Sequence, residues 1–159
     1  MLKPITLFFA LAALLSSGAA RAQAVLPYGL PISLDDAKKA ADAAVAEVAK
    51  AGSAPDVIAI VDPSGLLGYF ERMDNAQFGS IRVALDKART AAMFRRPSKV
   101  FEDALAKGRT AILGLHGTAP IEGGVPLVSA GKIVGAIGAS GGTAAQDGQV
   151  AKAGADTVK

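Results

Sequence analysis

Apolar residues recur at helical spacing directly after Ser33, in a segment that runs as far as Gly52. Ser33, with Asp36 three residues later, has the pattern of a capping box, and Gly52 is typical of a helix C-terminus. Charged side chains occupy the positions between the apolar ones, so the segment predicts an amphipathic helix with one buried face. The apolar stripe consists of Leu34, Ala37, Ala41, Ala44, Val45 and Val48.

Two segments rich in β-branched residues are interrupted by turn signals and predict two β-hairpins. The first covers residues 56–73 and turns at Asp62-Pro63-Ser64-Gly65, where Pro at the second position and Gly at the fourth favour a β-turn. The second joins residues 125–129 to residues 132–137 through Ala130-Gly131. Residues 111–115 fit either a short strand or an irregular segment.

Helical periodicity returns between the hairpins and after the second one. It predicts a helix that ends at Pro97, a short helix capped by Ser98, and a terminal helix capped by Thr143. The resulting order of helices and strands predicts an α+β fold. We expect an antiparallel sheet of about five strands flanked by helices, in a single-domain α/β sandwich.

The first 22 residues have the pattern of a secretory signal peptide. Lys3 precedes an apolar run from Ile5 to Leu15, and Ala20-Arg21-Ala22 fits an A-x-A cleavage site. We therefore expect an exported protein, periplasmic or secreted, whose domain covers residues 23–159. No later apolar run approaches the roughly 20 residues of a membrane-spanning helix, so an integral membrane protein is not expected.

Composition narrows the chemistry further. The 159 residues include 17 basic and 14 acidic side chains, and loss of the first 22 removes Lys3 and Arg21 but no acid. The remaining chain is close to neutral and has no basic block with interleaved aromatics, so a nucleic-acid partner is not expected. No cysteine and one histidine are present, which excludes thiolate zinc sites, cysteine nucleophiles and multi-histidine metal centres within one chain.

The most distinctive local motif is the glycine-rich stretch at residues 135–143, which leads from a predicted strand into a predicted helix. Free N–H groups at a helix N-terminus favour an anion, which makes Gly141, Gly142 and Thr143 candidate ligand contacts. The alternative is a tight connection that requires small residues. The segment 138–142 also matches G-x-S-x-G, but no histidine follows it, so hydrolase chemistry is not expected.

Three further side chains are candidates for binding. His116, the only histidine, lies between glycines and can ligate haem iron or act as a general base, or be a loop residue without either role. Arg72 and Lys87 can form a cationic pocket for carboxylates such as haem propionates. The alternative for both cations is a solvated or salt-bridged surface position.

Six short motifs occur in the order found in the GlcG/HbpS family, which the chain resembles over about residues 33–157. This resemblance implies an α+β sandwich assembled into homo-oligomers, and it places the chain beside extracellular haem-binding proteins that work with redox sensing. The motifs are Val61–Gly65, Arg72–Asp74, Lys87–Ala91, Arg96–Ser98, Gly123–Leu127 and Gly135–Gly142.

Two hypotheses about function follow. The first is an exported haem-binding or small-ligand-binding protein linked to redox or haem sensing, and not an autonomous enzyme; its iron ligand is His116. The second is an enzyme or catabolic accessory protein for a small organic acid in a glycolate-type pathway, with Asp74 or His116 as the base. A structural module without a ligand is a third possibility. The predicted cofactor site consists of His116, Arg72, Lys87, Gly141, Gly142 and Thr143.

Overall fold

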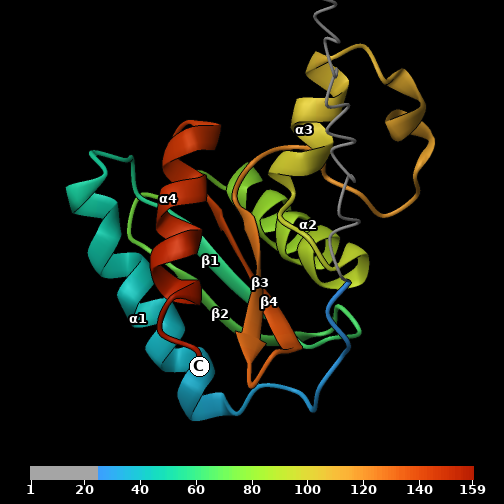
Figure 1. Ribbon diagram of the computed structural model, residues 1–159. Helices are drawn as coiled ribbons and strands as arrows, with labels where there is room; N and C mark the ends of the chain where they lie inside the picture. Colours follow the sequence, from blue (N-terminus) through green and yellow to red (C-terminus); the bar gives the residue numbers. More distant parts are fainter. Residues whose placement is uncertain (1–24) are drawn as a thin grey trace, which may run out of the picture.

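The computed structural model describes residues 25–159, in which four α-helices surround one antiparallel sheet (Figure 1). The predicted α+β class is confirmed, and the predicted signal peptide lies outside the described residues. The helices are α1 (Leu34–Lys50), α2 (Gly79–Phe94), α3 (Lys99–Ala106) and α4 (Ala144–Ala155), with a short 3-10 helix η1 (Thr110–Gly114). The strands are β1 (Val57–Val61), β2 (Leu67–Arg72), β3 (Gly124–Ser129) and β4 (Lys132–Ser140).

The sheet has the order β2-β1-β4-β3, so that β2 and β3 form its two edges. Both predicted hairpins are present, β1 with β2 and β3 with β4. The sheet has four strands rather than the expected five or so, because the undecided segment at residues 111–115 contributes to η1. Strand β4 extends past the predicted end at Ile137 as far as Ser140, so the first part of the glycine-rich stretch belongs to the sheet.

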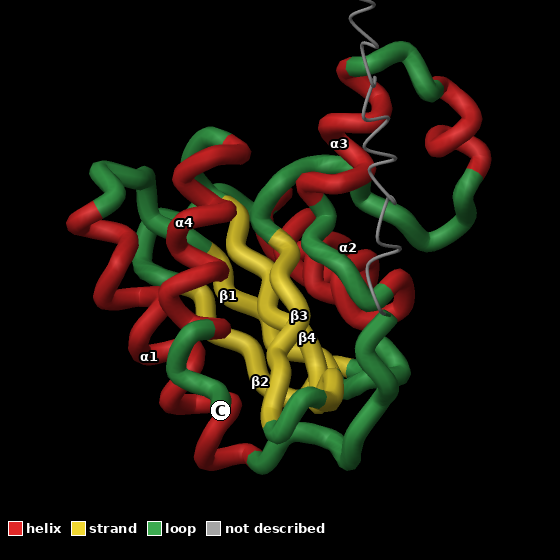
Figure 2. Tube along the Cα trace, in the orientation of Figure 1, coloured by secondary structure: helices red, strands yellow, loops and turns green. Residues whose placement is uncertain are grey.

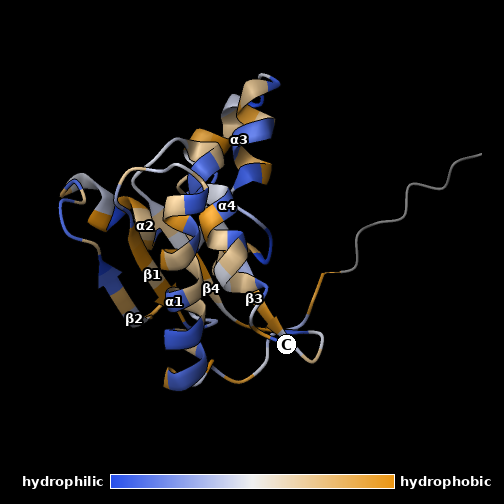
Figure 3. Cartoon of the chain, turned by 90° about the vertical axis from the view of Figure 1, so that its left-hand side faces the viewer, coloured by the Kyte–Doolittle hydropathy of each residue, from blue (hydrophilic) through white to orange (hydrophobic). Residues whose placement is uncertain are grey.

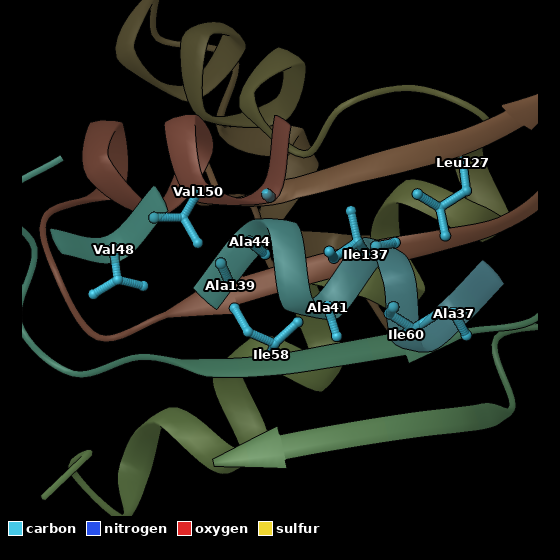
Figure 4. Packing of buried hydrophobic residues seen from close by; sticks show 12 residues of the cluster. Ala37, Ala41, Ala44, Val48, Ile58, Ile60, Leu127, Ile137, Ala139 and Val150 are labelled. Atoms are coloured by element: carbon cyan, nitrogen blue, oxygen red, sulfur yellow. The ribbon is translucent and has the colours of Figure 1, made fainter. Parts of the chain in front are cut away.

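Helices cover both faces of the sheet, which explains why β1 is buried along its whole length (Figure 2). Ile58 and Ile60 pack against α1 and α4 in the main core, which Figure 4 shows from close by. Their neighbours Val57, Ala59 and Val61 point to the opposite face, toward α2. Because successive side chains of a strand alternate between faces, a strand between two helical layers is apolar at every position.

Glycines in the sheet let helix α2 approach its backbone closely. A Cβ atom at Gly138 would clash with the carbonyl oxygen of Ala84 in α2, and one at Gly124 would clash with that of Lys87. The glycines of these motifs are therefore required for packing between the sheet and the helix.

Helix α3 and η1 form an arm that projects from the body of the molecule (Figure 1). Phe101 of α3 packs on Phe94 with 5.2 Å between the ring centroids, and Thr90 accepts a hydrogen bond of 2.7 Å from the N–H of Ala119. Ser98 stands before α3 as predicted, but its hydroxyl does not cap the helix. None of the helices within residues 25–159 is both long and apolar enough to cross a bilayer.

Candidate functional site

A buried ion pair joins α2, β4 and α4 at the end of the sheet. The ammonium of Lys87 lies 2.6 Å from Asp147 Oδ2 and also donates to the carbonyl of Ala139 at 3.2 Å. The two side chains are only 2% and 4% exposed. Burial of two unpaired charges would be very unfavourable, so each requires the other. Lys87 is thus neither a solvated surface group nor free to receive an anion while this pair is intact.

The glycine turn binds a carboxylate that belongs to the chain itself. Asp147 Oδ1 accepts hydrogen bonds from the N–H groups of Gly141 at 3.1 Å and Gly142 at 2.9 Å. Thr143 caps α4 as predicted, and Gln146 completes a capping box with it. Free N–H groups at the start of a helix favour an anion. In this fold Asp147 is that anion, and the three predicted contacts are used in closing the turn.

A second buried carboxyl, Asp56, lies on the other side of the same turn. It is 0% exposed, and Oδ1 accepts a hydrogen bond of 3.1 Å from Ser53. Oδ2 has no hydrogen-bond partner among the described residues. Burial, followed by the nearby charge of Asp147, raises the pKa of Asp56 to about 6. The Asp56 carboxyl therefore takes up a proton just below neutral pH.

An open groove of about 520 Å³ follows the β3 edge of the sheet, between α4 and the start of α3. Its size is in the range of small-molecule sites. We call it the β3–α4 groove. Its lining consists of Pro97, Lys99, Glu122, Gly123, Gly124, Val125, Pro126, Val128, Gly148, Lys152, Ala155, Asp156 and Val158.

The floor of the β3–α4 groove covers the buried ion pair. Gly123 has a φ of 127°, and a Cβ atom there would lie 2.8 Å from the ammonium of Lys87. Glycine at this position therefore allows the chain to run directly over the buried charges. A Cβ atom at Gly148, on the α4 side, would clash with the carboxylate of Glu122, so this glycine makes room for an acid inside the groove.

Two lysines reach the rim of the groove from opposite sides. Lys99 of α3 lies 3.1 Å from both Asp103 and Glu122, and these two carboxylates raise its pKa. Lys152 of α4 lies 2.5 Å from Asp156. Both lysines are about half exposed or more, so their ion pairs are of the weak surface type and can be exchanged for a ligand carboxylate.

The remaining predicted site residues lie elsewhere. His116 is exposed in the arm, in the loop after η1. Arg72 ends β2, at the opposite edge of the sheet from β3, and its guanidinium lies 5.5 Å from the ring centre of Phe78. The structure therefore does not gather the six predicted residues into one pocket.

Sequence reasoning missed the lysines of the groove and the role of Asp56. Lys99 begins α3 directly after a cap residue, and Lys152 lies on α4 one turn before Asp156. Each has the local pattern of an exposed helix face. Only the tertiary structure brings the two lysines to the same groove. Asp56 precedes an apolar strand, and this position was the one available sign of its burial.

The fold and the groove define a small α+β domain with a ligand-sized groove along one edge of its sheet. The chain belongs to the HbpS-like family: the family model described as "Haem degrading protein HbpS-like" matches residues 32–156. The predicted resemblance to the GlcG/HbpS family is thereby confirmed.

Three similar proteins illustrate this relationship. The chain is 43% identical over 83 residues to Protein GlcG of Escherichia coli K12, a match that covers 52% of this chain and 62% of GlcG. The chain thus spans less than two thirds of that relative. HbpS of Streptomyces reticuli, solved as a double mutant, is 32% identical with a TM-score of 0.74, over 84% of this chain and 91% of that one. A structure described as a PduOC:Heme complex is 25% identical with a TM-score of 0.72, over 82% and 96%.

Proposed function

We propose that this protein binds haem, or an anionic ligand of similar amphipathic character, in the β3–α4 groove. The observation that carries the proposal is an apolar groove of ligand size with a lysine on each side of its rim. A porphyrin with two carboxylates has the same two properties, a wide apolar face and a pair of negative charges. Membership of a family that contains haem-binding proteins supports the choice of haem.

The groove fits the porphyrin better than it fits the iron. Val125, Pro126, Val128 and Val158 offer apolar contacts for the ring, and Lys99 and Lys152 offer partners for the carboxylates. None of the usual axial ligands of haem iron, namely His, Met, Cys and Tyr, lines the groove. The proposal therefore rests on contacts to the porphyrin and includes no iron ligand within the groove. His116, outside it, stays a candidate ligand that the experiment below tests.

We also propose that the protein acts after export, in the periplasm or outside the cell, and as a homo-oligomer. Export is supported by the pattern of residues 1–22.

The test is a titration of the chain from Gln23 onward, which contains every described element, with hemin and with metal-free protoporphyrin IX. We expect saturable binding of both compounds, because the contacts are to the ring and the carboxylates. The double variant Lys99→Ala, Lys152→Ala should weaken both by about tenfold or more, which corresponds to about 1.4 kcal/mol. The control is Lys38→Ala, Lys39→Ala, which removes two exposed lysines from α1.

Each outcome of this titration has a distinct meaning. Equal affinity for both compounds, unchanged in His116→Ala, supports binding through the porphyrin alone. Tighter binding of hemin that is lost in His116→Ala makes the predicted histidine the iron ligand. No saturable binding of either compound overturns the proposal.

The same lysines support the second hypothesis, a site for a small organic acid. Lys99 and Lys152 face one groove that also contains Glu122. The lysines could bind the carboxylate of a short hydroxy acid, and its hydroxyl could donate a hydrogen bond to the carboxylate of Glu122. Stabilisation by millimolar carboxylic acids in a melting experiment, absent in the Lys99→Ala, Lys152→Ala variant, would favour this function. Such stabilisation without any porphyrin binding would decide in its favour.

A further inference from the structure

Strand β2 has an open edge. The N–H of Met73 donates to the carbonyl of Asp56 at 3.1 Å, so the backbone of Met73 faces β1. The direction in which the backbone N–H and C=O groups point alternates from one residue of a strand to the next. The backbone groups of Tyr69 and Glu71 therefore also point toward β1, whereas those of Phe70 and Arg72 point away from the sheet. Within residues 25–159 no hydrogen bond is made to these outward groups.

One face of β2 is also uncovered. The side chains of Phe70 and Arg72 point to the same face of the sheet as helix α2. That helix packs on β1, β4 and β3 and not on β2, so it leaves this part of the face uncovered. Beside these two side chains, at the start of α2, Phe78 is 78% exposed and Ile81 is 37% exposed. Phe70, Arg72, Phe78 and Ile81 form what we call the β2 patch. Strand β2 lies at the margin of the molecule in Figure 3. An unpaired strand edge next to exposed aromatics is a site where another strand can add.

We infer that β2 pairs antiparallel with β2 of a second copy of this chain, about a twofold axis at Phe70. This inference deepens the proposed homo-oligomer and rests on it. A strand related to itself by a twofold axis is always antiparallel, so one exposed edge provides both halves of the interface. The open sheet of each copy would then continue into that of the other.

The charges of β2 favour this register over the neighbouring one, in which the twofold axis lies at Glu71. With Phe70 opposite its equivalent, Glu71 faces Tyr69 of the second copy, and Tyr69 already donates to Glu71 within one chain at 3.3 Å. A shift of the axis to Glu71 would place two carboxylates directly opposite each other, which is destabilising. Arg72 faces Gly68 of the second copy, which leaves room for the long side chain.

The first measurement is the molecular mass in solution, by sedimentation and by native mass spectrometry. We expect an even multiple of the chain mass for the chain from Gln23 onward. Phe70→Lys, which places a charge at the axis, should reduce that mass to half or less. Val128→Lys places the same charge on β3, at the other edge of the sheet, and should leave the mass unchanged.

A cysteine variant tests the register without a loss of packing. The chain has no cysteine, so any crosslink reports the introduced one. Opposed residues of a hydrogen-bonded antiparallel pair have Cα atoms about 5.5 Å apart, which a disulfide can bridge. Mild oxidation should therefore dimerise Phe70→Cys efficiently and Val128→Cys poorly.

The inference would be overturned if the wild type were a monomer at tens of micromolar. It would also be overturned if Phe70→Lys left the mass of the oligomer unchanged and Phe70→Cys formed no crosslinked dimer. Ligand binding separates this failure from that of the proposed function. The β3–α4 groove lies at the opposite edge of the sheet, so Phe70→Lys should bind porphyrin within about twofold of the wild type. Loss of porphyrin binding together with the oligomer would show that the two properties share a surface and would overturn the placement of the interface.

Discussion

The two edges of the sheet are built in opposite ways. At the β3 edge, Gly124 donates to the hydroxyl of Ser98 at 2.9 Å and accepts from the N–H of Ser98 at 2.9 Å. Pro126 has no N–H to offer, and the pairing shifts between Leu127 and Val128. At the β2 edge the backbone groups of Phe70 and Arg72 are open.

This difference shows which contacts each edge is suited to. Pro residues, register shifts and covering loops prevent a strand edge from pairing with another chain. The β3 edge has all three and borders a groove, so it is suited to a small molecule. The β2 edge has only a register shift, opposite Ile60 and Val61, and it carries exposed apolar side chains. It is therefore suited to a second strand.

The largest expected effect comes from breaking the ion pair below the β3–α4 groove. Lys87→Met leaves Asp147 buried without its cation and should lower the free energy of unfolding by about 3–5 kcal/mol. Urea denaturation measures it. The matched control on the same helix is Arg82→Met, whose exposed pair with Asp86 should contribute less than about 0.5 kcal/mol. Equal losses in the two variants would contradict a structural role for the buried pair.

Asp56 lies between β1 and the end of β2: it directly precedes β1, and its carbonyl accepts a hydrogen bond from the N–H of Met73, directly after β2. Its pKa of about 6 in the folded protein is above the ordinary value of 3.8. The folded state therefore binds the proton more tightly than the unfolded state does. The stability that this proton gives is complete below pH 3.8 and is lost as the pH rises through about 6.

Asp56→Asn removes this titration. Relative to the wild type, the variant should therefore gain about 2–3 kcal/mol of stability between pH 4 and pH 7. Denaturation of both proteins across this range measures the gain, and other titrating groups cancel in the difference. A difference that is independent of pH would contradict a protonated, buried Asp56.

The fold was largely predictable because its signals are local. Ser33 and Thr143 begin helices through hydrogen bonds to residues three positions later, and both hairpins close through short turns. Ile81 shows the limit of such signals. It belongs to the apolar stripe of α2 but is 37% exposed, because this end of the helix does not lie over β2.

The site was less predictable because its partners are distant in the sequence. Lys87 lies three residues after the buried Ala84, a position on the inner face of α2, but its anion is 60 residues farther along the chain. No local pattern pairs these two charges, and Lys87 therefore had the pattern of a free cation. Asp147 lies in the first turn of α4, where an acid is common at a helix N-terminus, so its sequence position does not reveal its role in the glycine turn.

A smaller effect is expected where the β3 edge is closed by a single hydroxyl. Ser98 donates to the carbonyl of Ile121 at 2.6 Å and accepts from Gly124, both in largely buried surroundings. Ser98→Ala leaves both groups without this partner and should cost about 1–2 kcal/mol. The exposed Ser64 provides the control, since Ser64→Ala should change stability by less than about 0.5 kcal/mol. Faster hydrogen exchange at Gly124 should accompany the loss.

The smallest effect on the stability of a single copy is expected in the β2 patch. This contrasts with the large loss of stability expected at Lys87. Phe78 is 78% exposed and contacts the guanidinium of Arg72, so Phe78→Ser removes little that stabilises a single copy. The unfolding free energy of the monomeric Phe70→Lys protein should change by less than about 0.5 kcal/mol when Phe78→Ser is added. In the wild-type background the same substitution should weaken assembly, because there the ring is covered by the second copy. A residue that matters only in the assembled protein marks an interface, whereas equal effects in both backgrounds would assign Phe78 to the fold itself.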